Sequence, residues 1–165
     1  WSKNDQGLQK TNIKGWHSTT DMHTKVEYKH LIEELHIAQQ DIYKDECLEG
    51  EPLLGNMWAN INYKGGYNRP HIHPNSLWSG VYYIKTPDKC GHLKIEDTRT
   101  MSLMSIPKKT NKQEPKHLWR EVHFKPKAGR LIMFPSWVNH CVDSNESDDI
   151  RISVSFNFLQ KGMFV

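Results

Sequence analysis

The sequence has little cysteine and no long hydrophobic run. Its 165 residues include three cysteines, an odd number and too few for a disulfide framework, so we expect the reducing cytosol. No stretch approaches the roughly 20 apolar residues of a membrane helix, and no signal-peptide pattern opens the chain. We therefore expect a cytoplasmic protein with no membrane partner. Because the chain begins at Trp1 rather than methionine, N-terminal residues are expected to be missing.

An excess of charge of one sign is also lacking. The chain has 22 Lys and Arg residues against 19 Asp and Glu, a net charge of +3. The densest basic stretch, residues 108–116, lies in a polar segment from Thr98 to Lys116 that is expected to be a loop or lid. A nucleic-acid contact needs a broader basic face. The sequence therefore favours a solvated loop here, and no nucleic-acid partner is expected.

The pattern along the chain predicts one domain, residues 1–165, with a helical part and a β part. Residues 24–47 carry apolar side chains three and four positions apart, which predicts an amphipathic helix against a flat surface. Residues 57–159 consist of short apolar stretches separated by Gly, Pro, Asn and Asp. Because no helical pattern separates these stretches, we expect a mostly β fold, a jelly roll of about eight antiparallel strands with the helix packed on it.

The last predicted strand, residues 150–159, has one polar and one apolar face. Arg151 and Ser153 begin the polar face, and apolar residues alternate with it. The apolar face should pack on the core, so the polar face is expected to line a ligand cavity. Asn60 lies in an earlier strand, where asparagine is unusual, and either lines the same cavity or faces solvent.

Three histidines form the predicted metal site. His71 and His73 are two residues apart, so on an extended strand both imidazoles point to the same side. His140 follows another apolar strand and is expected to bring a third nitrogen to the same point. A register shifted by two residues would instead use His73 and Asn75. Zn²⁺ is the alternative metal, because three histidines and a water form a catalytic zinc pattern.

Arg151 has two candidate roles. Facing the cavity, its guanidinium could bind the carboxylate of an acidic co-substrate through two hydrogen bonds. On the surface, it would form an ion pair with Asp148 or Asp149. Its alternation with Ser153 favours the cavity.

The order and spacing of these residues resemble the Fe(II)/2-oxoglutarate-dependent oxygenases of the prolyl-hydroxylase type. The run from Trp58 to Phe158 is also similar to small 2-oxoglutarate oxygenases of marine bacteria and cyanophages, so the expected compartment is a bacterial or phage-infected host cytosol. The resemblance covers roughly residues 16–159. The segments that carry it are Tyr63–Gly66, His71–His73, Ser79–Ile84, Ala128–Ser136, His140 and Arg151–Ser153.

The resemblance implies two cofactors, Fe²⁺ and the co-substrate 2-oxoglutarate. It implies that the catalytic metal ligands are His71, His73 and His140. It further implies an O₂-dependent hydroxylation that releases succinate and CO₂. The substrate is unidentified, and a peptide or protein residue is one candidate. A homodimer is one open arrangement of the chain.

The co-substrate contacts follow from the same resemblance. Arg151 and Ser153 would hold the distal end of 2-oxoglutarate. Tyr83 would add a phenol hydrogen bond, or else serve as a core aromatic residue. Asn60 is the fourth residue expected at this contact, because of its unusual place in a strand and not because of the resemblance.

One position departs from the wider family. The family binds iron through His-x-Asp and a distal His, and here His73 stands at the Asp position. The chain would then lack the usual carboxylate ligand. Two alternatives therefore stay open: a non-catalytic metal- or ligand-binding jelly roll, and a three-histidine cupin-like dioxygenase that needs no co-substrate. Halogenation is disfavoured, because His73 would fill the space that a halide needs.

Overall fold

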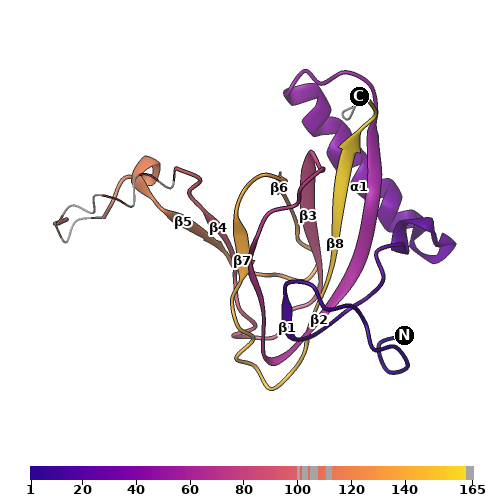
Figure 1. The fold of residues 1–165 in the computed structure, drawn as a ribbon, viewed down its shortest axis with the longest axis horizontal. Helices are drawn as coiled ribbons and strands as arrows, with labels where there is room; N and C mark the ends of the chain where they lie inside the picture. The colour runs from indigo at the N-terminus through magenta and orange to yellow at the C-terminus, as the bar shows by residue number, and fades with distance from the viewer. Residues whose placement is uncertain (100, 102–103, 105–107, 111–112, 163–165) are drawn as a thin grey trace.

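Alternating apolar and polar residues build a curled antiparallel sheet with one long helix beside it (Figure 1). The computed structural model describes residues 1–99, 101, 104, 108–110 and 113–162. Over these ranges the strands are β1 (Asn12–His17), β2 (Pro52–His71), β3 (Trp78–Lys85), β4 (Leu93–Glu96), β5 (Glu121–Phe124), β6 (Leu131–Pro135), β7 (His140–Val142) and β8 (Arg151–Gln160). Their order is β5-β4-β7-β2-β8-β3-β6, and β1 pairs with β2. The predicted mostly β, jelly-roll class is confirmed.

The two longest strands form the centre of the sheet. β2 pairs with β8 from Pro52↔Gln160 to Asn62↔Arg151, and β3 pairs with the other edge of β8. The apolar face of β8 packs into the main core, which also takes residues from β2 and the helix; its buried members are Met22, Leu35, Leu54, Met57, Val154, Phe156 and Phe158.

The helix α1 (Lys29–Asp45) packs on this core as predicted, but it is shorter than the expected 24–47. Its buried residues Leu35, Gln39 and Tyr43 are four positions apart and so lie on one face. The preceding residues form two 3₁₀ turns, η1 (Met22–Thr24) and η2 (Val26–Tyr28). Among the described helices, none combines the length and the hydrophobicity of a membrane span.

The sheet is larger at its N-terminal side than the predicted β part, 57–159. β2 begins at Pro52 and continues through Gly65 and Gly66, where the sequence suggested an end. Gly65 has φ 74°, and a Cβ on Gly66 would lie 2.5 Å from the Lys14 carbonyl oxygen. The glycine pair therefore lets β2 pass close to β1, with a register shift, instead of ending it.

Gly80 of β3 provides a test of how tightly the sheet packs on its core. A Cβ at this position would lie 2.3 Å from Cζ of Phe156, which is completely buried. We expect Gly80→Ala to lower the free energy of unfolding by about 1–3 kcal/mol, because an added methyl group must displace a packed ring. Urea unfolding measures this, with the exposed Val26→Ala as control. Equal stability of the two variants would contradict this packing.

Candidate active site

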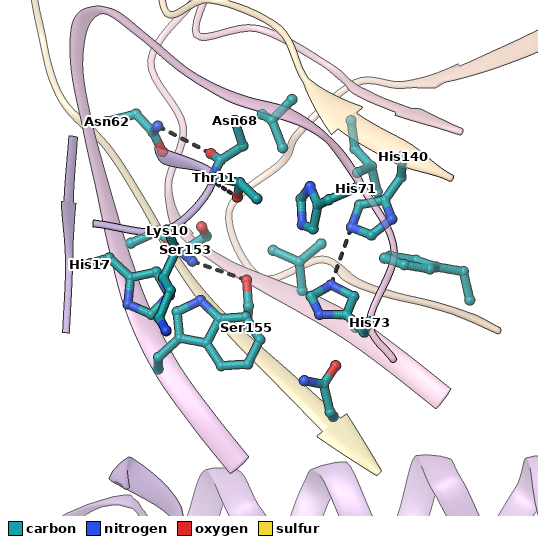
Figure 2. A pocket seen from close by; sticks show the side chains of 18 of the residues that line it. Lys10, Thr11, His17, Asn62, Asn68, His71, His73, His140, Ser153 and Ser155 are labelled. Atoms are coloured by element: carbon teal, nitrogen blue, oxygen red, sulfur yellow. Dashed lines mark hydrogen bonds between the residues drawn. The ribbon is translucent and has the colours of Figure 1, made fainter. Parts of the chain in front are cut away.

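Three imidazoles meet where β2 ends and β7 begins (Figure 2). His71, the last residue of β2, is paired with His140, the first residue of β7. His73 lies beyond the strand and not on it, held by a 2.9 Å hydrogen bond from its backbone N–H to the Ser136 carbonyl. The strand argument was therefore wrong for His73, yet its ring reaches the same point. One nitrogen from each ring lies within 4.8 Å of the others.

Burial keeps these three imidazoles neutral near pH 7. Desolvation, together with the neighbouring imidazoles, lowers the pKa of His73 to about 3. Burial and the nearby His71 lower the pKa of His140 to about 4. Burial also lowers the pKa of His71. A neutral imidazole keeps a lone pair on one nitrogen, which is the form that binds a metal.

Backbone carbonyls orient two of the rings. Nδ1 of His71 lies 2.6 Å from the Arg69 oxygen, and Nδ1 of His140 lies 3.0 Å from the Val138 oxygen. A carbonyl only accepts, so Nδ1 donates the proton and Nε2 keeps its lone pair, the arrangement common to metal-binding histidines. Nε2 of His140 is 3.3 Å from Nε2 of His73. Two nitrogens bound to one ion at about 2.0–2.1 Å lie roughly this far apart, so the donor set fits a divalent ion.

The shifted register is not supported. Asn75 has φ 62°, is exposed, and does not line the cavity beside the histidines. His73 does line it.

A cavity of about 300 Å³ opens beside the three histidines, and its polar wall comes from three neighbouring strands. β8 lies between β2 and β3, so their register places polar residues side by side. Ser153 is paired with Asn60 on β2 and with Tyr83 on β3. The polar face predicted for the last strand lies in this wall, as Arg151, Ser153, Ser155 and Asn157.

Arg151 is a buried cation with spare hydrogen-bonding capacity. It is only 2% exposed, and Nη1 donates to the Cys90 carbonyl oxygen at 2.5 Å. Nη2 is buried and has no partner among the described residues. Asp148 and Asp149 bind the side chains of two exposed lysines instead. The surface ion-pair alternative is therefore excluded, and an unpaired N–H of a guanidinium is available to an anion.

The other predicted co-substrate residues lie in the same cavity. Burial raises the pKa of Tyr83 to about 12, so its phenol stays protonated and can donate. Asn60 donates from Nδ2 to Ser155 Oγ at 3.0 Å, and its Oδ1 is buried without a partner among the described residues. The solvent-facing alternative for Asn60 is thus excluded, since the residue is 7% exposed.

The N-terminal segment supplies cavity residues that sequence reasoning missed. Lys10, Thr11 and His17 line the cavity because β1 pairs with the middle of β2. The His17 ring stacks on Trp58 with centroids 5.4 Å apart. Residues 12–17 carry no regular alternation of apolar and polar side chains, and the left-handed Lys14 (φ 46°) interrupts the strand.

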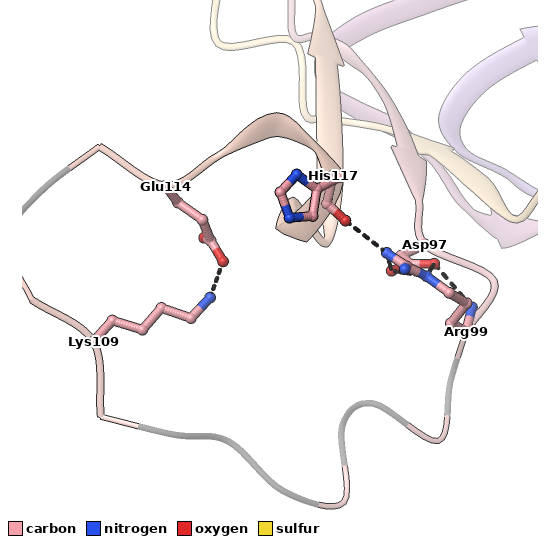
Figure 3. A network of polar contacts seen from close by, with 5 residues as sticks. All are labelled: Asp97, Arg99, Lys109, Glu114 and His117. Atoms are coloured by element: carbon pink, nitrogen blue, oxygen red, sulfur yellow. Dashed lines mark hydrogen bonds and ion pairs between the residues drawn. The ribbon is translucent and has the colours of Figure 1, made fainter.

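The segment expected to be a loop or lid, Thr98–Lys116, lies partly outside the described residues. Figure 3 shows two of its ion pairs, Lys109 with Glu114 and Arg99 with Asp97, and both are exposed. Arg99 binds Asp97 through Nη2 at 2.7 Å and donates to the His117 carbonyl at 3.1 Å. Such exposed ion pairs contribute about 0–1 kcal/mol each. The hydrogen bond from Arg99 to His117 joins the two ends of the segment, and these exposed contacts add little stability.

Comparison with known proteins assigns the family. A family described as "Putative 2OG-Fe(II) oxygenase" matches residues 56–157. The chain belongs to this family. Its cofactors are the predicted ones, Fe²⁺ and 2-oxoglutarate. The matched segment contains every predicted site residue. No curated protein matches the chain.

Solved structures share the fold at low sequence identity. A prolyl-4-hydroxylase from Pseudomonas putida is 16% identical with a TM-score of 0.62, over 89% of this chain and 72% of that one. The viral collagen prolyl hydroxylase of Paramecium Bursaria Chlorella virus-1, in its 2OG complex, is 15% identical with a TM-score of 0.58, over 87% and 77%. The epimerase SnoN, in complex with Fe³⁺, alpha ketoglutarate and nogalamycin RO, is 15% identical with a TM-score of 0.59, over 89% and 64%.

Some matched enzymes are much longer. The chain covers 44% of an oxidoreductase of the 2OG-Fe(II) oxygenase family from Burkholderia pseudomallei. At these identities the likeness concerns the fold, since one fold supports several reactions.

The low pKa values of the histidines predict how pH affects the metal-free protein. The folded-state pKa values of about 3 for His73 and 4 for His140 lie below the ordinary 6.5. As pH falls below 6.5, the unfolded chain binds protons that the folded chain does not, so stability decreases. We expect this loss between about pH 6.5 and 4, at up to about 1.4 kcal/mol per pH unit for each histidine. Urea unfolding at several pH values measures this loss. His73→Gln should make the free energy of unfolding change less steeply with pH, and an unchanged pH dependence would contradict the low pKa of His73.

Proposed function

We propose that the protein is a 2-oxoglutarate- and O₂-dependent iron oxygenase that hydroxylates a substrate C–H bond, releasing succinate and CO₂. His71, His73 and His140 would hold Fe²⁺, since their neutral nitrogens converge and fit one ion. Three protein ligands on one face leave positions for co-substrate and oxygen. Bound together, the ion and 2-oxoglutarate supply the oxidative chemistry, and the chain supplies binding, orientation and exclusion of water.

The observation that carries this proposal is the charge of the cavity. The described residues that line it include Arg151 and Lys10 but no Asp or Glu. Arg151 is buried without a carboxylate partner among the described residues, and this costs energy unless an anion binds. Three neutral histidines would leave the +2 charge of iron uncompensated. A dianion such as 2-oxoglutarate matches both requirements.

The residues around Arg151 would orient the co-substrate. The guanidinium of Arg151 would bind the C5 carboxylate, because a planar fork suits a carboxylate better than a point charge does. Tyr83 would donate its phenol proton to the same group. Ser153 is paired with Tyr83 and lies two residues after Arg151 on β8, so it can contact the same carboxylate. Asn60, with its free Oδ1, would accept a hydrogen bond from a water or from the substrate.

The proposed substrate is a residue of a peptide or protein. The support is the fold shared with the two prolyl hydroxylases. The epimerase SnoN, whose structure contains nogalamycin RO, has the same fold, so the fold alone does not choose the substrate.

Iron binding tests the three ligands. We expect His71→Ala or His140→Ala to abolish stoichiometric Fe²⁺ binding, because two nitrogens hold the ion poorly, while exposed His117→Ala keeps it. His73→Asp restores the carboxylate of the wider family and should keep iron and some 2-oxoglutarate turnover. Anaerobic equilibrium dialysis with Fe²⁺ measures the stoichiometry. A His71→Ala protein that binds as many iron ions per chain as the wild type would refute the assignment.

Co-substrate binding tests Arg151. Under anaerobic conditions, Fe²⁺ and 2-oxoglutarate should produce a weak visible charge-transfer band in the wild-type protein. Arg151→Ala should keep iron but weaken 2-oxoglutarate binding by tens to thousands of fold, since losing a buried charged partner costs about 2–5 kcal/mol. Arg151→Lys should lie between the two, because it keeps the charge without the fork.

The same titration separates the alternatives. A non-catalytic binding module shows no band, and a three-histidine dioxygenase without co-substrate binds iron but shows no band with 2-oxoglutarate. Pyruvate lacks the distal carboxylate, so it should bind weakly to the wild-type protein and with about the same weak affinity to Arg151→Ala. Unchanged 2-oxoglutarate affinity in Arg151→Ala would overturn the co-substrate assignment.

A further inference from the structure

A second group of potential metal ligands lies on the other face of the sheet. His92, His123 and Asp143 each place one donor atom within 4.8 Å of the others. Leu93 and Val142 line the oxygenase cavity. Their chain neighbours His92 and Asp143 point to the opposite face, because side chains alternate along a strand. The backbone N–H of Asp143 donates to the His92 carbonyl at 2.9 Å, which keeps the two residues side by side.

The hydrogen bond of His123 determines which of its nitrogens is free. Nε2 of His123 lies 2.7 Å from Oε1 of Glu121, and a carboxylate can only accept. Nε2 therefore carries the proton, and in the neutral ring Nδ1 keeps its lone pair. Nδ1 lies 4.0 Å from Oδ2 of Asp143, so two acceptors face each other without a donor between them. A cation between them would satisfy both.

We propose that His92, His123 and Asp143 bind a structural Zn²⁺ ion. Imidazole nitrogen and carboxylate oxygen are ligands that zinc prefers. At ordinary zinc distances, a nitrogen and an oxygen in a tetrahedral site lie about 3.3 Å apart. Small side-chain rotations can close the 4.0 Å separation, because His123 is exposed and Asp143 is partly exposed.

The surroundings of His123 have the second layer of contacts typical of zinc sites. A zinc-bound histidine usually donates its other N–H to a carboxylate, which orients the ring and raises its basicity. Glu121 accepts this bond, and Lys94 holds Glu121 through an ion pair of 2.8 Å. The positive charge of Lys94 balances the negative charge of Glu121. The carboxylate of Asp143 is therefore the negative charge that faces the ion.

The ion would connect strands that pairing leaves weakly joined. β5 lies at the edge of the sheet and, among the described strands, pairs only with β4. β4 and β5 together project from the body of the sheet (Figure 1). The proposed ligands come from β5, from the residue before β4 and from the residue after β7. Zinc would thus fasten β5 to β7, the short strand that begins with His140.

Zinc counting tests the site. In the His71→Ala protein, which lacks a ligand of the oxygenase site, equilibrium dialysis with Zn²⁺ and elemental analysis should still find one ion per chain. Adding His123→Ala or Asp143→Asn should remove it, and adding exposed His30→Ala should not. Glu121→Gln should keep the count at saturation but weaken affinity by about 10–100-fold.

Hydrogen exchange supplies a second measurement. Zn²⁺ should slow amide exchange in Glu121–Phe124 of the His71→Ala protein and should have no effect once His123→Ala is added. Circular dichroism without metal checks that each variant folds, and exposed His123 provides the safer variant should Asp143→Asn unfold. No zinc in the His71→Ala protein, or the same count after His123→Ala, would overturn the proposal. Neither result depends on oxygenase activity.

Discussion

β8 is paired along one edge with β2 and along the other with β3, and this three-strand block supports both the core and the cavity. Backbone pairing fixes which residues stand side by side, and alternation fixes which face each one meets. Phe156 and Phe158 are completely buried in the core, while Arg151 and Ser153 line the cavity on the other face. A one-residue slip of β8 would exchange these faces, placing a guanidinium among apolar side chains.

Burial of polar groups in the cavity has a chemical consequence. Desolvation holds three imidazoles neutral and keeps the phenol of Tyr83 protonated, while Arg151 remains a cation because its guanidinium does not lose its proton in proteins. The cavity therefore presents nitrogen lone pairs at one place and hydrogen-bond donors at another. An anion that chelates a metal through one end and carries a carboxylate at the other matches this arrangement.

The part of the sheet formed by β4 and β7 has different chemistry on its two faces. His140 points toward the cavity, whereas Asp143, three residues later, points to the outer face beside His92 and His123. β7 is only three residues long. Its position consequently depends on its neighbours β2 and β4, so any contact that holds the outer face also affects where His140 lies.

The sequence by itself was sufficient for the fold class, the helix and the two faces of β8. Residues 150–158 alternate without interruption, and alternation needs no tertiary information. The order of His71, His73, His140 and Arg151 likewise indicated the family, because motif spacing is a property of the chain. The boundaries were less certain: α1 is shorter than the helical pattern, since the 3₁₀ turns before it contain apolar residues such as the exposed Val26.

Only the tertiary structure decided which distant residues meet. Lys10 and His17 reach the cavity because β1 pairs with β2 some 50 residues away, and the glycine pair that lets β2 pass β1 looked like a strand end in the sequence. His73 reaches the other two histidines from a loop, by a backbone bond to Ser136 that no pattern predicts. His92 and His123 come together through the register of β4 and β5. Each of these contacts depends on strand pairing between distant segments, whose free energy depends on the whole sheet and is not encoded in either segment alone.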